Sequence, residues 1–166
     1  MGRIVLSLLV DNTSGVLSRV AGLFSRRGYN IESLTVGVTA DPRYSRMTVV
    51  SDGDQEILEQ IEKQLSKLED VRDIKQLHAD HAVCRELIMV KIRAHAEQRS
   101  AINAIADIFR ATIVDVGKES MTVMLTGDQS KLEALISLLE DYEILELART
   151  GITGLSRGAD DIRYLP

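Results

Sequence analysis

The chain contains 166 residues, a length that suits one large domain or two small ones and excludes most large multidomain enzymes. Hydrophobic residues make up 45% of the chain and charged residues 27%, as in ordinary globular proteins with a packed core. The 20 Lys and Arg residues against 25 Asp and Glu residues give a net charge of −5 with both signs interleaved, so we expect no nucleic-acid partner.

Three further features bear on the cellular compartment. The chain has one cysteine, Cys84, which cannot form an internal disulfide and suits a reducing environment. The apolar stretch within residues 1–10 ends abruptly at the polar Asp11, so it is too short to be a signal peptide. No apolar run approaches the ~20 residues that cross a bilayer. We therefore expect a soluble, cytoplasmic protein without a membrane partner.

The first half of the chain alternates between the apolar period of a strand and that of a helix. Gly28 stands where a left-handed helix C-cap belongs, and Asp54 is a candidate N-cap. The expected elements, in chain order, are a strand at 3–10, a helix from Val16 that ends before Gly28, strands at 31–39 and 47–50, a helix that starts after Asp54, and a strand at 71–77. Their order is βαββαβ.

The second half repeats this order. The expected elements are a strand at 87–93, a helix that includes 102–109, strands at 113–116 and 121–125, a helix that includes 132–139, and a strand at 144–147. The second helix of each half also opens alike, with Gly53-Asp54-Gln55 in the first and Gly127-Asp128-Gln129 in the second. The two halves therefore predict two copies of one unit.

A βαββαβ unit of about 75 residues is the ferredoxin-like split βαβ fold, a four-stranded antiparallel sheet with both helices on one face. We therefore expect an α+β protein of two ferredoxin-like domains. The first covers residues 1–78 and the second covers 86–149, with a linker at 79–85 and a C-terminal tail at 150–166 outside both domains. This fold supports many functions, so the choice depends on the site residues.

His78, His81 and Cys84 follow each other at intervals of three residues. Imidazole and thiolate are good ligands for zinc or copper, so these residues form the most suggestive metal constellation in the chain. The alternative is that they simply belong in and beside the linker. At this spacing the three side chains share one face only in a helix, and the predicted fold has no helix there. We therefore expect no metal in this chain, and the sequence leaves open whether these residues ever bind one.

Other chemistries find little support in the sequence. A nucleophile-based enzyme needs a base and an orienting group, and His95 is the only histidine outside the linker region. An RNA-recognition domain stacks bases on aromatic side chains, but the strands at 3–10 and 46–51 contain none. The segment 151–158 is rich in glycine but lacks the spacing of a phosphate-binding loop, so we expect a flexible or partner-docking tail.

The turn at 11–15 offers the best candidate ligand site. Gly15 lets the backbone approach a ligand without a Cβ in the way. The N–H groups of Val16 and Leu17 lie at the start of the first helix, where geometry and the helix dipole favour an anion. A carboxylate suits this position.

Asn12 and the start of the second strand extend this site. Asn12 and Asn30 supply amide oxygens for an ammonium group, and Ile31 supplies an apolar wall. With the helix start, these residues describe an amino-acid pocket. The alternative, which stays open at this point, is that Gly15 only serves a tight turn while both asparagines cap a helix or turn end.

Several stretches closely resemble the small regulatory subunit of acetohydroxyacid synthase (acetolactate synthase), a family with an ACT domain. The N-terminal signature is the most specific of them, and the resemblance extends over nearly the whole chain. The stretches are 12–20 (NTSGVLSRV), 22–36 (GLFSRRGYNIESLTV), 45–48 (SRMT), 60–65 (QIEKQL), 85–92, 109–116 and 154–158 (GLSRG).

The resemblance implies an N-terminal ACT domain, a second ferredoxin-like domain, and a homodimer whose paired ACT domains bind L-valine at their interface. Such a chain is not an enzyme by itself. It activates a separate catalytic large subunit, which makes acetolactate from pyruvate in branched-chain amino acid biosynthesis, and confers feedback inhibition by valine. Thiamine diphosphate, magnesium and FAD then belong to the catalytic partner, and this chain holds no cofactor.

The family's valine-site positions match Asn12, Gly15 and Asn30, and Val16, Leu17 and Ile31 fall beside them. The resemblance thus places the valine carboxylate at the start of the first helix and its ammonium at the two asparagines. Departures from the family include Asp11, Gly37 and the stretch 96–99 (AEQR). The alternative function is a stand-alone ACT-type amino-acid sensor that regulates another enzyme or a transcription factor. Whether valine, leucine or isoleucine binds best is open.

Overall fold

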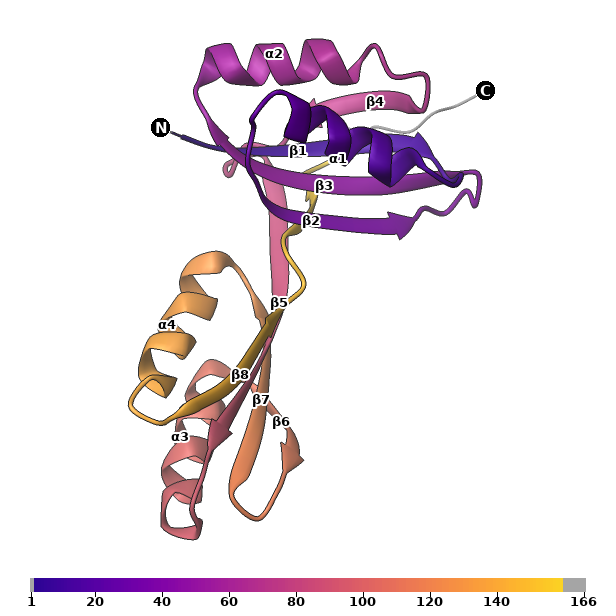
Figure 1. The fold of residues 1–166 in the computed structure, drawn as a ribbon. Coiled ribbons are helices and arrows are strands. Elements are labelled where there is room, and N and C mark those ends of the chain that lie inside the picture. Colours follow the sequence, from indigo (N-terminus) through magenta and orange to yellow (C-terminus); the bar gives the residue numbers. More distant parts are fainter. Residues whose placement is uncertain (1, 160–166) are drawn as a thin grey trace. The chain divides into compact units, whose positions relative to one another are not determined.

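The computed structural model describes residues 2–159 and divides into two units. The first unit comprises the chain up to Cys84 together with the segment that begins at Ile152, and the second is Arg85–Gly151. Each unit contains the predicted βαββαβ order (Figure 1), so the expected α+β fold of two ferredoxin-like domains is confirmed.

The first unit contains an antiparallel sheet in the order β2-β3-β1-β4. Its elements are β1 (Gly2–Asp11), α1 (Val16–Arg26), β2 (Ile31–Val38), β3 (Tyr44–Gly53), α2 (Gln55–Leu65) and β4 (Val71–Gln76). Because β3 lies between β1 and β2 and is antiparallel to both, these two strands run in the same direction. Ser51 of β3 pairs with Ile4 of β1 and with Ile31 of β2, so both strands start at the same end of the sheet.

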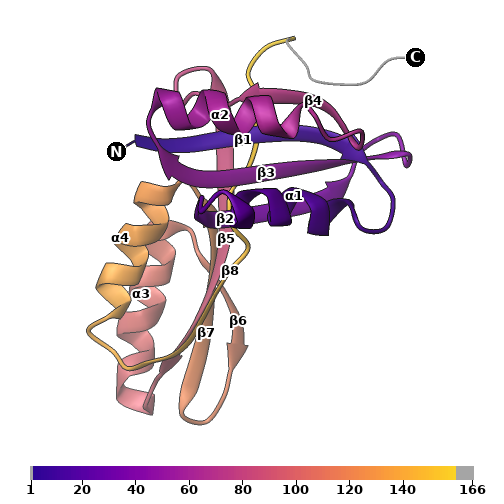
Figure 2. The ribbon, with the colours of Figure 1, turned by 45° about the horizontal axis from the view of Figure 1, so that its top comes forward.

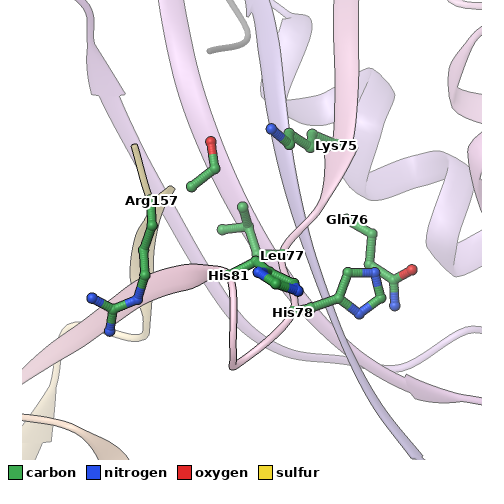
Figure 3. A pocket seen from close by; sticks show the side chains of 7 residues that line it. Lys75, Gln76, Leu77, His78, His81 and Arg157 are labelled. Carbon is green, nitrogen blue, oxygen red and sulfur yellow. The ribbon is translucent and has the colours of Figure 1, made fainter. Parts of the chain in front are cut away.

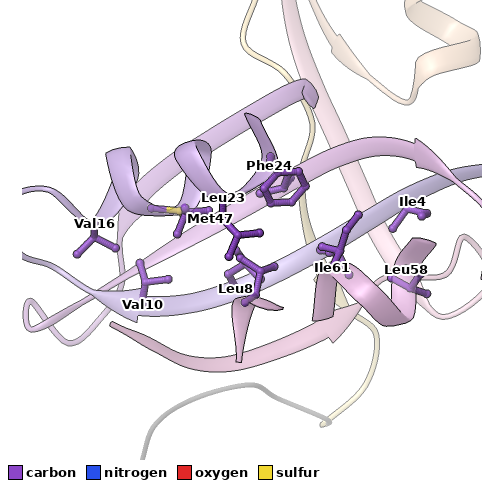
Figure 4. Close-up of a cluster of buried hydrophobic side chains, with 13 residues drawn as sticks. Ile4, Leu8, Val10, Val16, Leu23, Phe24, Met47, Leu58 and Ile61 are labelled. Atoms are coloured by element: carbon purple, nitrogen blue, oxygen red, sulfur yellow. The ribbon is translucent and has the colours of Figure 1, made fainter. Parts of the chain in front are cut away.

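The core of the first unit lies between this sheet and the helices α1 and α2, which cover one face (Figure 2). Alternate residues of β1 point toward the helices, and Figure 4 shows Leu8 beneath Phe24 and Ile61. Each fully buried side chain of this size contributes roughly 1.5–3 kcal/mol. The buried residues of this cluster are Ile4, Leu6, Leu8, Val10, Val16, Val20, Leu23, Phe24, Met47, Val49, Leu58, Ile61 and Leu65.

The second unit repeats the architecture with its own core. Its strands follow the order β6-β7-β5-β8, and α3 and α4 pack against the sheet. The elements are β5 (Ala82–Arg93), whose residues up to Cys84 belong to the first unit, the 3-10 helix η1 (Ala96–Gln98), α3 (Arg99–Phe109), β6 (Thr112–Val116), β7 (Ser120–Gly127), α4 (Gln129–Leu139) and β8 (Ile144–Arg149). Its buried cluster includes Ile88, Val90, Ile102, Leu132 and Leu135.

The expected linker and tail differ from what the structure contains. Strand β5 already begins at Ala82, inside the stretch expected to be a linker. The described part of the expected tail contains β9 (Thr153–Ser156), which pairs with β5 and contacts Val83 and Cys84, in the part of β5 that belongs to the first unit. Ile152, 7% exposed, donates its N–H to Ser33 Oγ at 3.0 Å and accepts from Thr35 Oγ1 at 3.1 Å. This segment therefore belongs to the first unit, and residues 160–166 of the expected tail lie outside the described residues.

Within residues 2–159, no helix is long and apolar enough to cross a membrane.

Candidate functional site

The turn between β1 and α1 has the geometry of an anion site. Gly15 is the N-cap of α1 at φ 86°, a left-handed conformation that favours glycine. Its position supplies no side-chain cap, and the first turn of α1 holds no acidic residue. The first N–H groups of a helix have no intrahelical acceptor, and the helix dipole gives them a partial positive charge. The N–H groups of Val16 and Leu17 therefore offer donors to a carboxylate.

Arg19 adds a positive charge beside this turn. Its Nη1 lies 2.7 Å from the position that a Cβ on Gly15 would occupy, so the guanidinium directly adjoins the glycine. Arg19 Nε is 2.6 Å from Asp70 Oδ2, and this hydrogen bond raises the pKa of Arg19 above its ordinary value. The pair holds the Arg19 guanidinium next to the start of α1, with Asp70 balancing its charge.

A second ion pair fixes the end of β1. Asp11 accepts from Arg72 Nε at 2.8 Å and from its Nη2 at 2.9 Å. The N–H of Asp11 donates to the carbonyl oxygen of Asp70 at 2.8 Å. Arg72 of β4 therefore balances the negative charge of Asp11. This carboxylate then repels an anion at the start of α1 less than an unpaired one would.

Asn12 connects this turn to the loop that follows β2. Its N–H donates to the carbonyl oxygen of Arg43 at 2.8 Å, and its Nδ2 donates to the carbonyl oxygen of Pro42 at 2.9 Å. These bonds give Asn12 the turn-fixing role considered from the sequence. Because these bonds use the backbone N–H and the Nδ2 of Asn12 as donors, its amide oxygen is the group that can accept from an ammonium.

Asn30 and Ile31 lie at the other end of the same sheet. Ile31 shares Ser51 as a pairing partner with Ile4, at the start of β1, whereas Asn12 follows the end of β1. At about 3.3 Å per residue, the length of β1 between these ends is about 23 Å. The Asn30 carbonyl oxygen accepts from Ser51 Oγ at 2.6 Å. Within one chain, the structure therefore does not bring the two halves of the predicted pocket together.

The side chains beside Gly15 differ in what they can contribute. Val16 is only 3% exposed and packs in the core of the first unit, so it can reach a ligand with its N–H but not its side chain. Leu17 is exposed and presents its side chain at the surface. Of the two, Leu17 is therefore the one that can form part of an apolar wall.

The edge strand β2 is exposed and apolar. It is the terminal strand of its sheet, so one side of its backbone faces no neighbouring strand of the sheet. Val36 is 47% and Val38 61% exposed, and a Cβ on Gly37 would meet nothing within 4 Å. An apolar edge of this kind is a template for pairing with another strand.

The suggested metal constellation separates in the structure. His78 and His81 line a pocket, but Cys84 is not among the lining residues, and its Sγ lies 2.7 Å from the position of a Cβ on Gly154. Among residues 2–159, no group of three or more His, Cys, Asp or Glu side chains could hold a metal ion.

The pairing of Arg19 with Asp70 could not be predicted from the sequence. The two residues are 51 positions apart, and neither belongs to a periodic pattern that predicts the contact. The single local signal was that Arg19 lies one helical turn after Gly15, which places it above the start of the helix.

Models of two domain families match the chain. Residues 6–73 match an ACT domain of the acetohydroxyacid synthase small-subunit type, and residues 85–158 match the small subunit of acetolactate synthase. The acetolactate synthase isozyme 3 small subunit of Salmonella typhimurium is 51% identical over 157 residues, which are 94% of this chain and 96% of the relative. The chain belongs to the acetolactate synthase small-subunit family.

Other relatives agree with this membership. The probable acetolactate synthase small subunit of Methanothermobacter thermautotrophicus is 50% identical over 156 residues, 93% of either chain. The crystal structure of the small subunit from Thermotoga maritima superimposes with a TM-score of 0.89 at 39% identity and covers 96% of this chain and 100% of that one. The comparisons thus confirm the family that the sequence motifs indicated.

Proposed function

We propose that this chain is the non-catalytic regulatory subunit of an acetolactate synthase, and that it senses L-valine. The observation that carries the proposal is the start of α1, where Gly15 supplies no side-chain cap and Arg19 stands beside backbone donors that have no intrahelical acceptor. Membership in the acetolactate synthase small-subunit family supplies the class of ligand and the catalytic large subunit as partner.

The valine site requires two copies of the chain. If the β2 edges of two copies pair antiparallel, the start of β2 in one copy lies beside the end of β2 in the other. The end of β2 is the end that carries the Asn12 turn, because Asn12 is bonded to Pro42 just beyond β2. Asn30 and Ile31 of the second copy then complete the site that one chain leaves open. The exposed apolar edge at Val36 and Val38 supports this homodimer.

Each part of valine has a counterpart in this arrangement. Its carboxylate accepts from the N–H groups of Val16 and Leu17, an interaction worth about 0.3–1 kcal/mol when exposed and up to about 2 kcal/mol when partly buried. Its ammonium donates to the amide oxygens of Asn12 and of Asn30 from the second copy. Its isopropyl group packs against Ile31 of that copy.

Regulation follows from the position of the ligand between two copies. Valine stabilises the arrangement of the dimer to which it binds better, and the catalytic subunit responds to that arrangement. Thiamine diphosphate, magnesium and FAD belong to the catalytic subunit, where they supply the chemistry that joins two pyruvates. The residues of this chain bind the effector and take part in no chemical step.

Calorimetric titration of the purified chain with L-valine, L-leucine and L-isoleucine tests the ligand and the site together. Gly15→Asp places a carboxylate where that of the ligand belongs, so we expect valine affinity to fall at least about tenfold. Gly15→Ala strains the same backbone without adding charge and serves as the matched control. Thermal melts of both variants establish that they fold.

Two outcomes would contradict the proposal. If Gly15→Asp binds valine as tightly as the wild type, the carboxylate does not lie at the start of α1. If Gly15→Ala and Gly15→Asp lose affinity equally, the loss arises from the strained turn, and the assigned contact with the carboxylate is wrong. Activity of the catalytic subunit, measured with and without this chain and valine, tests the regulatory role separately.

A further inference from the structure

A second concave site lies in the first unit, where the chain leaves β4 and the C-terminal segment passes. It is a pocket of about 170 Å³ that opens to solvent. Figure 3 shows two cationic side chains, Lys75 and Arg157, and two histidines around it. Lys75 belongs to β4, His78 and His81 to the loop before β5, and Arg157 to the segment after β9. The proposed valine site uses none of these residues.

The pocket concentrates positive charge in a protein whose net charge is −5. No Asp or Glu lines the pocket within the described part of the chain. The ion pairs found among residues 2–159 involve other cations, and none includes Lys75 or Arg157. These cations are Arg3, Arg19, Arg43, Arg72, Lys91, Arg93 and Arg149. The cationic groups of the pocket are thus available to an external anion.

Backbone hydrogen bonds hold the three lining segments together without a ligand. The N–H of Leu77 donates to the carbonyl oxygen of Val5 at 2.8 Å, which fixes the end of β4. The N–H of His81 donates to the carbonyl oxygen of His78 at 2.9 Å and closes the loop. The N–H of Arg157 donates to the carbonyl oxygen of His81 at 2.8 Å and ties the C-terminal segment to that loop. A preformed pocket lowers the entropic cost of binding.

Gly154 controls how closely the C-terminal segment approaches. A Cβ at this position would lie 2.7 Å from Cys84 Sγ, 2.9 Å from Leu77 Cδ1 and 3.2 Å from the carbonyl oxygen of Val83. The last of these contacts is with backbone, which cannot move aside as a side chain can. Glycine at 154 therefore allows the C-terminal segment to lie close to Leu77 and to the start of β5, and the N–H of Arg157 reaches His81 from this segment.

We propose that this pocket binds a small phosphate-type anion, either free phosphate or pyrophosphate or the phosphoryl group of a metabolite. Side chains that carry donors line it from three separate segments, and this arrangement suits the tetrahedrally placed oxygens of phosphate better than a planar carboxylate. Guanidinium, ammonium and imidazole groups all donate to phosphate oxygens, and the charged donors form the stronger bonds. The charges of Lys75 and Arg157 also oppose a metal cation at His78 and His81.

Titration of the full-length chain with sodium pyrophosphate tests the proposal, with orthophosphate and succinate as comparators. We expect saturable binding of pyrophosphate, weaker binding of orthophosphate and none of succinate at the same concentration. Removal of one cationic group, in Lys75→Gln or Arg157→Gln, should weaken pyrophosphate binding about three- to fivefold, and the double variant at least tenfold. Lys67→Gln and Arg27→Gln remove exposed charges elsewhere and should leave binding unchanged.

Three results of these titrations would contradict the proposed phosphate site. No binding of pyrophosphate by the wild type at low ionic strength would overturn the proposal. Equal weakening in pocket and control variants would show that the anion only follows the general charge of the protein. Succinate binding as tight as that of pyrophosphate would assign a carboxylate ligand. Either result would also overturn the proposal. Valine affinity should be unchanged in the pocket variants, so failure here leaves the proposed valine site untouched.

Discussion

Gly15 and Gly154 stand at positions where a side chain would collide with its surroundings. At Gly15 the neighbour is the flexible end of Arg19, and the backbone angle itself favours glycine. At Gly154 the neighbours are Cys84, Leu77 and a backbone carbonyl oxygen. The first glycine shapes the candidate ligand site, and the second allows the C-terminal segment to pack.

Gly154→Ala should destabilise the first unit. The added methyl group forces β9 away from β5 or distorts the packing of Leu77, and overpacking of this kind costs about 1–3 kcal/mol. Urea denaturation measures the free energy of unfolding. Gly22→Ala is the control, because a Cβ there meets only Arg26 Nη1 at 3.7 Å and alanine favours the helix by roughly 0.5–1 kcal/mol. Equal stability of the two variants would contradict the packing described for Gly154.

The helices differ in how their N-termini are satisfied. Asp54 accepts from the N–H of Ile57 at 3.0 Å at the start of α2, and Asp128 accepts from the N–H of Lys131 at 3.0 Å at the start of α4. Helix α1 follows Gly15 and has no side-chain cap. Helix α3 has none either, but the 3-10 helix η1 leads directly into it. The helix start assigned to valine thus has donors that no side chain caps, which agrees with the proposed function.

Asp54→Ala should lower the free energy of unfolding by about 0.5–2 kcal/mol, because the N–H of Ile57 loses its acceptor. Asp54→Asn retains an oxygen at this position and should recover most of that loss. Denaturant unfolding of the two variants distinguishes the cap from a general effect of charge. If alanine and asparagine destabilise equally, the hydrogen bond of the cap is not what stabilises α2.

Stability should depend on the charge of Asp128 in acid. Hydrogen bonds from the Lys131 N–H and from Ser130 lower the pKa of Asp128 in the folded state. A carboxyl whose folded pKa is lowered stabilises the fold above its unfolded pKa of about 3.9, and this contribution disappears as the pH falls through the lower folded value. The melting-temperature advantage of wild type over Asp128→Asn should therefore shrink below about pH 4. Asp141→Asn, in the exposed turn after α4, is the comparison.

The whole molecule consists of two units with separate hydrophobic cores. Ile61 belongs to the first core and Leu135 to the second, and both side chains are fully buried. Truncation of either to alanine creates a cavity and costs about 2–5 kcal/mol. Calorimetry should show that Ile61→Ala lowers one unfolding transition and Leu135→Ala the other. A single transition that both variants lower equally would mean that the cores unfold as one.

The homodimer should depend on the edge of β2. Val38 is 61% exposed in the single chain, so Val38→Lys removes no packing within the unit but places two lysines near the paired edges. We expect sedimentation to show a shift toward monomer, with valine binding lost in parallel because each site needs both copies. Lys63→Glu, on the exposed surface of α2, controls for surface charge. A monomeric Val38→Lys that still binds valine would contradict the shared site.

The sequence by itself determined the elements and the family. Alternating and helical apolar periods are local, so the strand at 3–10, the helix from Val16 and their counterparts in the second half could be predicted without the fold. The helix start at Gly15 could be predicted for the same reason, since its glycine and its free donors are neighbours in the chain. The stretch 12–36 carried the family resemblance that the comparisons confirm.

Only the tertiary structure decided which distant residues meet. It joined Arg19 to Asp70, packed Ile152 and β9 against the first unit, and placed Asn30 at the opposite end of the sheet from Asn12. The register of β3 between β1 and β2 sets that last separation, and no local pattern in either strand reports it. Contacts across many residues depend on how whole elements pack, whereas apolar periodicity describes one element at a time.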